Sequence, residues 1–454
     1  MGLRPLMTDA PFIFEHYAFD AASGILRLNY RFEDGPSFEE RVTFPTPPQS
    51  LSPARMAAFD AACRLVFLLA GVSYYKAYVP RILKCEAFPL TAPWASFIET
   101  VYRNGLGEFA YRNKINLIDK IKFETQNGTQ PSPPALNLPH QLLVPVGGGK
   151  DSIVSIEALK KTGLPITLYA QCKAIDDVAA PIMATIATSG LPALKVARSI
   201  SPSLIELNKT GVLNGHVPIT AILSSMAVAS AILYGFDTVV LSNEHSASAP
   251  NLVIDGIDIN HQYSKSLAFE QGFADFIQRH IAPDIKYFSL LRPLTEAAIA
   301  RRFARLKNYH GIFRSCNTAF RQDREKRGTN WCCDCPKCRF VFMALAPFTP
   351  KAELVKVFGK DMLDDKAQEK GFAELTGLGD YKPFECVGEI EESALLMEKL
   401  VSIDAWKDDV VVRDLGVRLS AQPKDFDKLY EDLFRLRTDH RVPQEFMQVL
   451  DENR

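Results

Sequence analysis

The chain lacks an excess of charge of either sign: 52 lysines and arginines stand against 53 aspartates and glutamates, which leaves a formal net charge of −1. Proteins that bind nucleic acid over a broad surface usually carry a basic excess, so we expect no nucleic-acid partner. The hydrophobic share of 47% and the charged share of 23% exclude a disordered or low-complexity chain. The length of 454 residues is enough for about three domains.

The chain also lacks the features of an exported or membrane protein. Nine cysteines are too few for a disulfide scaffold of this length, and residues 1–14 contain no long apolar run that would predict a secretory signal. The longest uncharged apolar stretch, residues 217–236, has about the ~20 residues that a membrane span needs. Pro218 and several serines interrupt it, and a strand-like TVVLS follows at once. We therefore expect a buried helix, no membrane partner and a cytoplasmic protein.

The first third of the chain, residues 1–135, has the pattern of a small α+β domain. FIFEHYAF, GILRLNYRF and ERVTF alternate apolar with polar side chains, and the AASG and EDGPS between them are typical of turns. These runs predict about three antiparallel strands. Apolar residues at helical spacing follow between Met56 and Ala70. A segment rich in Pro, Asn and Gln, residues 124–140, is expected to be a linker.

Residues 136–348 show a different pattern. LLVPV, PITLYA, ALKVA, TVVLS and KYFSLL are short apolar runs without alternation, which is typical of buried parallel strands. Helices are expected over residues 151–162, 181–189 and 220–234, so strand and helix alternate. Residues 349–454 are mostly helical by periodicity. The predicted fold class is α/β, with a parallel, doubly wound sheet, an N-terminal α+β domain and a helical C-terminal region.

A glycine-rich turn stands between the first of these apolar runs and the helix after it, in the sequence LLVPV-GGGKDS. Glycines let the backbone adopt positive φ and approach a ligand closely, and a helix N-terminus presents free N–H groups to an anion. The lysine adds a positive charge. The expected phosphate-binding residues are Gly147, Gly148, Gly149, Lys150, Asp151 and Ser152. The alternative is a strand–helix turn that binds nothing.

This turn is neither the kinase-type P-loop nor the dinucleotide-binding turn. It resembles the pyrophosphate loop (PP-loop, SGGxDS) of ATP pyrophosphatase-type enzymes, which bind ATP across the top of a parallel sheet, transfer AMP to an oxygen and release pyrophosphate. The chain departs from that pattern at Gly147, where the loop usually has serine. It therefore lacks a hydroxyl that could contact phosphate.

Four of the nine cysteines lie close together, at Cys332, Cys333, Cys335 and Cys338. The spacing C-x-x-C-x-x-C, with Cys316 upstream, offers four thiolates to a structural zinc ion and leaves Cys333 as a spare. A [4Fe–4S] cluster would accept the same ligands, and buried cysteines without a metal are a third interpretation. Zinc is favoured because nothing else in the chain suggests electron transfer. The arrangement resembles the zinc site of 7-cyano-7-deazaguanine synthases, which are also PP-loop enzymes.

Three polar segments stand beside the apolar runs of the middle third. They are NGHVPIT with His216, SNEHSAS with Asn243 and Glu244, and NHQYSKSLAFE with His261, Lys265 and Glu270. Each alone is more often a helix cap or a solvated turn. However, open α/β sheets bind ligands at the carboxyl ends of their strands, so the three segments together indicate a site at one edge of the sheet.

Over nearly its whole length the chain resembles the ATP-dependent UDP-N-acetyl-α-D-muramoyl-L-alanyl-L-glutamate epimerases of bacterial peptidoglycan synthesis. The stretches that carry the resemblance are GVSYYKA, GLGEFAYRN, VPVGGGKDSIVSIEAL, NGHVPIT, SNEHSAS, NHQYSKS, FSLLRPLTE, WCCDCPKCRFVF and KPFECVGE. The resemblance implies inversion of the terminal L-glutamate of UDP-N-acetylmuramoyl-L-alanyl-L-glutamate to D-glutamate. ATP would be converted to AMP and pyrophosphate, with Mg²⁺ bridging phosphate oxygens.

The candidates for the acid and the base of such an inversion are His216, His261, Lys265, Glu244, Glu385 and Cys386. Histidine suits proton transfer at neutral pH, and a thiol is a plausible second group if it is activated. No pairing follows from the sequence, and neither does the oligomeric state. Two alternatives remain open: another PP-loop adenylating enzyme, such as an amide- or nitrile-forming ligase or a thiolation enzyme, and a nucleotide sensor without turnover.

Overall fold

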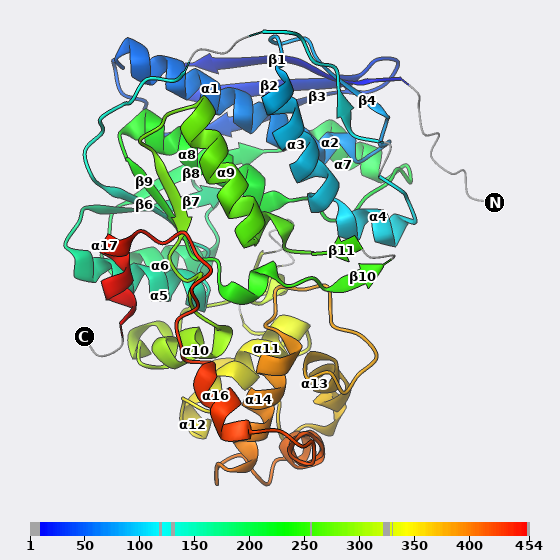
Figure 1. Ribbon diagram of the computed structural model, residues 1–454, viewed down its shortest axis with the longest axis vertical. Helices are drawn as coiled ribbons and strands as arrows, with labels where there is room; N and C mark the ends of the chain where they lie inside the picture. The colour runs from blue at the N-terminus through cyan, green and yellow to red at the C-terminus, as the bar shows by residue number, and fades with distance from the viewer. Residues whose placement is uncertain are drawn as a thin grey trace.

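The computed structural model describes residues 10–117, 120–128, 132–254, 257–320, 327–328 and 330–451 (Figure 1). Most of the N-terminal stretch 1–14, for which we expect no secretory signal, lies outside the described residues. So do residues 129–131 of the predicted linker. The described remainder of that linker contains neither helix nor strand.

A single mixed sheet of ten strands runs through the molecule. The strands lie in the order β12 (Lys286–Ser289), β9 (Thr238–Leu241), β6 (Leu142–Pro145), β7 (Ile166–Cys172), β8 (Ala193–Ser199), β3 (Ser37–Thr43), β2 (Ile25–Phe32), β1 (Phe12–Asp20), β4 (Ile82–Cys85) and β5 (Lys122–Phe123). The first five are parallel to one another, and β1, β2 and β3 are antiparallel. Both predicted strand patterns are therefore confirmed.

The two parts of the sheet join where β3 pairs with β8 in an antiparallel register that places Val42 opposite Arg198. A buried ion pair reinforces the join, because Nε of Arg198 donates to the Glu40 carboxylate at 2.6 Å. The hydroxyl of Tyr74 donates to the same carboxylate at 2.8 Å. The α+β segment and the α/β segment therefore share one continuous sheet.

Helix α1 (Pro53–Ala70) packs against one face of the antiparallel strands. Ser52 caps it by accepting from the backbone N–H of Arg55, and Pro53 occupies its first turn, where no intrahelical N–H is needed. With α2 (Val72–Tyr75) it forms the one described segment that is long and apolar enough to cross a membrane. However, 72% of that window is buried inside the protein, as in the core helix of a globular domain.

Helices cover both faces of the parallel strands, as the predicted α/β class requires. Leu143 and Val239 belong to the core that contains α1 and α8 (Ile219–Tyr234), whereas Leu142, Val144 and Val240 face the second core. The other helices of this part are α5 (Lys150–Leu159), α6 (Ala180–Ser189), α7 (Pro202–Asn208), α9 (Leu267–His280) and α10 (Glu296–Ala304). The expected buried helix over 220–234 is α8, and it packs against α1.

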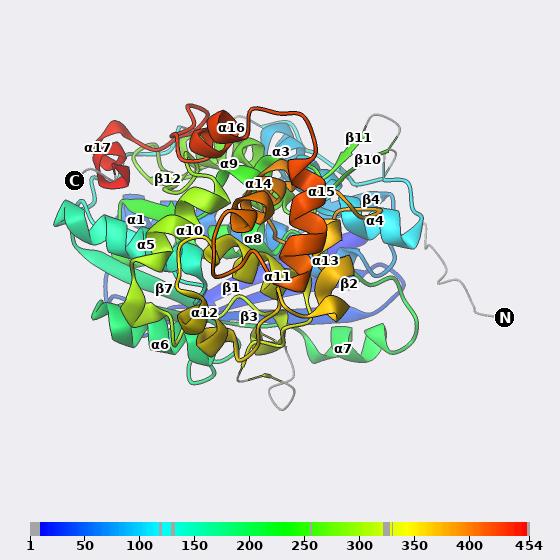
Figure 2. The same cartoon turned by 90° about the horizontal axis from the view of Figure 1, so that it is seen from below.

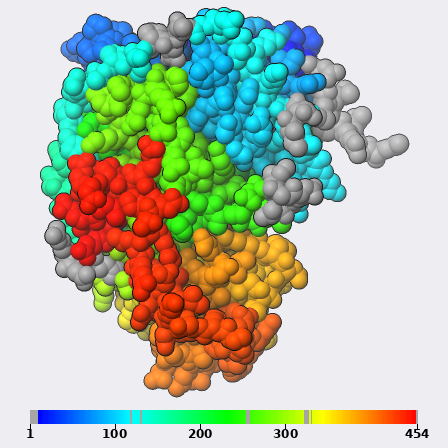
Figure 3. All heavy atoms as spheres, viewed as in Figure 1, coloured from blue at the N-terminus to red at the C-terminus, as the bar shows by residue number. Residues whose placement is uncertain are grey.

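The C-terminal region is helical, as predicted, and gathers at the end of the molecule opposite β1 and β2 (Figures 1 and 2). Its helices are α11 (Pro336–Leu345), α12 (Lys351–Phe358), α13 (Glu369–Leu375), α14 (Ile390–Val401), α15 (Val417–Ser420) and α16 (Phe426–Asp432). In the space-filling view it forms a narrower lower end (Figure 3). The chain then returns to the sheet at α17 (Gln444–Met447), where the ring of Phe446 lies 5.1 Å from that of Phe288.

Two helices and a pair of antiparallel strands that the sequence patterns did not predict stand beside the site described next. They are α3 (Ala92–Gly105), α4 (Gly107–Asn113) and the pair β10 (Leu252–Ile254) and β11 (Ile257–Ile259).

Candidate active site

The glycine-rich turn links the end of β6 to the start of α5, as the sequence predicts. Gly148 has φ of +73°, and a Cβ atom there would lie 2.9 Å from the carbonyl carbon of Pro181. Its own carbonyl accepts a 2.9 Å hydrogen bond from the backbone N–H of Arg314. Glycine is therefore required at this position. Gly147 differs, because no atom lies within 4 Å of the place where its Cβ would stand.

The Lys150 side chain turns into the protein and is only 2% exposed. Its ammonium forms ion pairs with Asp151 and with Glu296, the first residue of α10. Burial alone would lower the pKa of Lys150, but the two carboxylates raise it above its usual value. The ion pair of Lys150 with Glu296 thus connects α5 to α10. Glu296 is a buried partner that could not be predicted from the sequence.

A cavity of about 310 Å³ opens beside this turn, at the carboxyl ends of β6 and β9. Its lining includes Gly147, Gly149, Lys150, Asp151, Ser152, Asn243, Glu244, Lys265, Glu296, Arg314, Lys337 and Cys386. Two of the three polar segments predicted to meet at one edge of the sheet therefore reach the same space as the glycine turn. Open α/β sheets bind ligands at such an edge.

Arg292 is fully buried and hydrogen-bonds the main chain of two residues that line the cavity. Its guanidinium donates to the carbonyl oxygens of Glu244, at 2.6 Å, and Lys265, at 2.5 Å. Its charge is balanced by Glu270, 2.9 Å away. Glu270 is therefore a structural ion-pair partner, and the main chain beside both candidate residues is rigidly held.

The Cys386 thiol lies among positively charged side chains at the cavity wall. Nζ of Lys265 donates to its Sγ atom at 3.3 Å, and the imidazole of His261 is near enough to the same sulfur to stabilise its negative charge. Burial would raise the pKa of the thiol, but Lys265, His261 and Lys337 together lower it from 9.0 to about 6. Cys386 is therefore mostly a thiolate at neutral pH.

His261 connects Cys386 to Glu108, a residue of α4 that is 5% exposed. Nδ1 of His261 hydrogen-bonds a carboxylate oxygen of Glu108. Burial would lower the pKa of His261, but the hydrogen bonds with Cys386 and Glu108 raise it to about 9. The imidazole is therefore protonated at neutral pH. Glu108 was not among the predicted candidates, although it stands within the GLGEFAYRN stretch.

His216 lies directly beside this group. Its ring centroid is 4.2 Å from that of His261, and its Nδ1 is 4.0 Å from the Glu108 carboxylate. Burial and the positive charge of His261 lower the pKa of His216 to about 4. His216 is consequently neutral at pH 7 and has a free lone pair, whereas His261 is charged.

Of the predicted acid–base candidates, His216, His261 and Glu385 do not line the cavity, and Glu385 instead contacts Asn317 and Lys337. The Glu385 carboxylate accepts from Nδ2 of Asn317 at 2.7 Å and lies 3.8 Å from the ammonium of Lys337. Its neighbour Cys386 lines the cavity, because the two side chains leave the chain in different directions.

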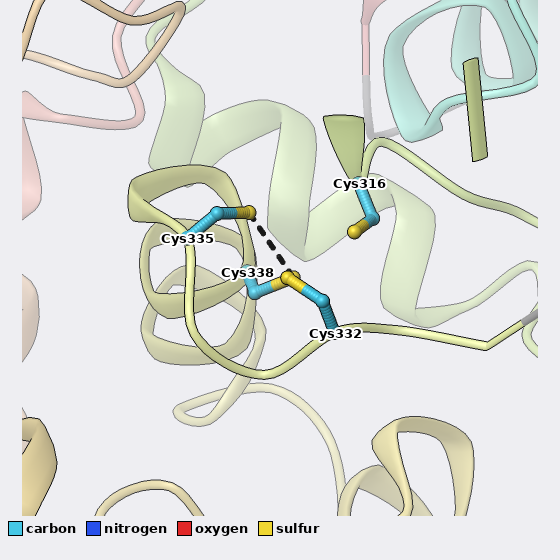
Figure 4. A group of neighbouring side chains, drawn as sticks. All are labelled: Cys316, Cys332, Cys335 and Cys338. Atoms are coloured by element: carbon cyan, nitrogen blue, oxygen red, sulfur yellow. Dashed lines mark hydrogen bonds between the residues drawn. The ribbon is translucent and has the colours of Figure 1, made fainter. Parts of the chain in front are cut away.

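The four cysteines expected to bind a metal converge on one point (Figure 4). The sulfurs of Cys316, Cys332, Cys335 and Cys338 lie within 4.8 Å of one another, and the group could hold a metal such as zinc. Cys333 is not part of it, since its sulfur lies 3.4 Å from the carbonyl oxygen of Phe358.

The cysteine group supports the glycine turn through the residues just before Cys316. The backbone of Arg314 binds Gly148, and Oγ of Ser315 lies 2.8 Å from the position of a Cβ on Gly149. A metal at the cysteines would therefore hold this segment against the glycine turn.

Comparison with known proteins identifies the family. Residues 7–290 match the model of the MurL N-terminal domain, and residues 312–429 match that of the MurL C-terminal domain. The chain belongs to the MurL family. A relative from Xanthomonas oryzae pv. oryzae, named UDP-N-acetyl-alpha-D-muramoyl-L-alanyl-L-glutamate epimerase, is 44% identical over 95% of both chains. Relatives with the same name from Salinispora tropica and Micromonospora sp. are each 43% identical over 89% of this chain, and the matches cover 88% and 90% of those relatives.

The residues that line the cavity come from both of the regions that the family models match. The glycine turn, Glu244 and Lys265 lie in the part that matches the MurL N-terminal domain, whereas Cys386 and the group at Cys332 lie in the part that matches the C-terminal domain. The cavity of this family member is thus built from both regions.

Proposed function

We propose that this protein is an ATP-dependent UDP-N-acetyl-α-D-muramoyl-L-alanyl-L-glutamate epimerase, which inverts the terminal L-glutamate of the nucleotide dipeptide for peptidoglycan synthesis. The observation that carries the proposal is the 44% identity, over 95% of the chain, to a relative of that name. The cavity supports the chemistry, since a phosphate-type loop and a set of titratable side chains share it. Because ATP and a UDP-linked substrate are cytoplasmic metabolites, the reaction takes place in the cytoplasm.

The reaction begins with adenylation of the carboxylate next to the Cα that is inverted. Removing the Cα–H beside a free carboxylate would build a second negative charge next to the first. Transfer of AMP makes a neutral mixed anhydride whose neighbouring proton is far more acidic. The proposal assigns binding of the departing pyrophosphate to the turn from Gly147 to Ser152, with the N-terminus of α5 behind it.

Mg²⁺ and zinc fit different parts of the structure. Hard divalent cations bind carboxylate and phosphate oxygens, and the carboxylates of Asp151 and Glu244 line the cavity. When bound there, Mg²⁺ would neutralise charge on the phosphates. Zinc fits the four sulfurs of the cysteine group. Because four thiolates fill its coordination shell and leave no open position, that ion is structural.

The proton transfers use the histidines beside Cys386. His216 is neutral and accepts the Cα proton. The charged groups near it, His261 and Lys265, are protonated and can donate the proton that Cα receives on its other face. Glu244 lines the same cavity as the glycine turn, and the proposal assigns it to the metal rather than to proton transfer.

His216→Gln is expected to lower the rate of epimerisation by about 100-fold or more, because a general base contributes roughly 10²–10⁴-fold. Dipeptide-dependent AMP formation should fall much less. His16→Gln is the matched control, since His16 is exposed on β1. Chiral analysis of glutamate and AMP release measured on the same samples separate the two effects. A variant with full epimerisation would remove His216 from the mechanism.

The pH dependence of kcat/KM should be bell-shaped. We expect activity to need Cys386 as a thiolate beside His261 and Lys265, so it falls as the pH drops through about 6. It also needs protonated His261, so it falls as the pH rises through about 9. The charged groups that set these values are Lys265, Lys337 and Glu108, and Glu108→Gln should move the upper limb to lower pH. An upper limb that stays in place in that variant would contradict the assignment.

The proposed function is tested by incubating the protein with ATP, Mg²⁺ and UDP-N-acetylmuramoyl-L-alanyl-L-glutamate and resolving the glutamate released by hydrolysis on a chiral column. D-glutamate that forms only with ATP, together with AMP and pyrophosphate, is the expected result. Unchanged L-glutamate with continued AMP formation would favour another PP-loop adenylating enzyme, such as an amide- or nitrile-forming ligase or a thiolation enzyme. No ATP turnover would favour a nucleotide sensor.

A further inference from the structure

Three side chains from distant parts of the chain lie in series, and the last of them lines the cavity. Glu108 on α4 binds Nδ1 of His261, and the charge of His261 acts on the neighbouring sulfur of Cys386. Lys265 contacts the same sulfur at 3.3 Å. Nucleophile, histidine and acid in this order are the arrangement by which many acyl-transfer enzymes activate a thiol or a hydroxyl.

The sulfur also stands where an acyl group would be delivered. Cys386 lines the same cavity as Gly149, Asp151 and Ser152, so an acyl adenylate whose phosphate lies at the loop can present its carbonyl carbon to the thiol. Arg292 holds the main chain of Lys265 in place, which keeps the cation beside the sulfur.

We infer that Cys386 is a nucleophile that takes the activated acyl group from AMP, and that the glutamate is inverted while it is bound to the enzyme as a thioester. The inference rests on the proposed function, because the acyl adenylate is the donor. Cys386 is then a catalytic residue, and Glu108 is a positioning residue that acts through His261.

The steps balance without a further reagent. The thiolate attacks the carbonyl carbon, a C–S bond forms, the C–O bond to phosphate breaks, and AMP leaves with the electron pair. His216 takes the Cα proton, and His261 or Lys265 returns a proton to the opposite face. Water then adds to the thioester and gives a proton to the residue that had lost one, the C–S bond breaks with its electron pair on sulfur, and the thiolate leaves toward Lys265 and His261. The new carboxylic acid and His216 release their protons to solvent. The net reaction is hydrolysis of the adenylate to the inverted carboxylate and AMP.

The charges around Cys386 suit a nucleophile better than a base. Two cations make the thiolate a weak base, which is poorly suited to removing a proton from carbon. Its nucleophilicity falls less than its basicity, with a Brønsted coefficient of about 0.4–0.5, and AMP is a good leaving group. A thioester also resists water better than an acyl adenylate while it keeps the neighbouring C–H acidic, so inversion has time to occur before hydrolysis.

Cys386→Ala distinguishes the thioester from a role in proton transfer alone. Three quantities are measured on the full-length enzyme: dipeptide-dependent exchange of labelled pyrophosphate into ATP, release of AMP, and D-glutamate. We expect exchange within about threefold of the wild type, but AMP release and inversion lowered by at least about 100-fold. The adenylate forms in this variant and has no acceptor. Cys85→Ala, a thiol on β4 outside the cavity, is the control.

AMP release that continues at the wild-type rate with unchanged L-glutamate would overturn the proposal, because water would then be attacking the adenylate directly. Loss of the exchange reaction would also overturn it, since Cys386 would be acting in adenylation. A wild-type enzyme that forms no D-glutamate would instead refute the proposed function, so the two failures are distinguishable.

Acid quenching during the first turnover gives a direct measurement on the wild type. The expected result is a mass increase equal to the dipeptide nucleotide minus water, located on Cys386 and removed by hydroxylamine. A mass increase on another residue would count against the proposal. So would AMP and free dipeptide that appear in step at every quench time, with no mass increase.

Discussion

Gly148→Ala is expected to abolish adenylation while the protein still folds. The Gly148 backbone has φ of +73°, and a methyl group there would meet the Pro181 carbonyl carbon at 2.9 Å and the Ile182 nitrogen at 3.0 Å. Left-handed backbone costs an L-residue about 1–2 kcal/mol, and the overlap with the backbone in the first turn of α6 forces the glycine turn to move. A displacement of about 1 Å at a reacting group can cost roughly 100-fold in rate. Dipeptide-dependent exchange of pyrophosphate into ATP should therefore fall by at least that factor.

Gly147→Ser is the matched control one residue away. It restores the residue that PP-loops usually have at this position. No atom lies within 4 Å of the Cβ position, and Gly147 is not among the glycines with positive φ. Exchange should stay within about threefold of the wild type. Equal losses in the two variants would mean that the backbone geometry of the turn does not decide phosphate binding.

Cys335→Ser is expected to release the metal and destabilise the whole protein. Zinc needs its four thiolates, and structural zinc sites supply about 10 kcal/mol or more of apparent folding free energy in small domains. Bound zinc should fall from about one equivalent to almost none, and the Tm should fall by about 10 °C or more. Elemental analysis and thermal unfolding of the purified variants provide the measurement.

Cys333→Ser is the control for that experiment, because the Cys333 sulfur faces the carbonyl of Phe358 and lies outside the four-cysteine group. It should retain the metal. Iron and a visible absorption band in the wild type would favour the [4Fe–4S] alternative. A Cys335→Ser protein with full metal content and an unchanged Tm would contradict a metal-binding role for the group.

Removing the metal should also weaken the loop. The segment before Cys316 donates a backbone hydrogen bond to Gly148 and packs against Gly149. We therefore expect a raised KM for ATP in protein that has lost its metal but remains folded.

Patterns that depend on neighbouring residues could be predicted from the sequence. A strand alternates apolar with polar residues when one face of the sheet is buried, and it is an apolar run when both faces are buried. The glycine turn lies between a strand and a helix that are adjacent in the chain, so its shape follows from local geometry. The three clustered cysteines are likewise close in sequence, and only Cys316 had to be brought in from upstream.

The charged partners of the site could not be predicted in this way. Glu108 meets His261 across 153 residues of sequence, and Lys150 meets Glu296 across 146 residues. A glutamate in an amphipathic helix such as α4 looks like any solvated side chain until the fold buries it. The directions of neighbouring side chains could not be predicted either, since Cys386 lines the cavity and Glu385 does not.

The sequence by itself therefore determined the α/β class, the helical C-terminal region, the glycine turn and the family resemblance, because each depends on short-range patterns. Only the tertiary structure decided that β3 and β8 join the two parts into one sheet, that Glu108 binds His261 next to Cys386, and that Cys386 lines the same cavity as the glycine turn. The physical reason is that burial and charge pairing set the ionisation of these groups, and both arise from contacts between segments far apart in the chain.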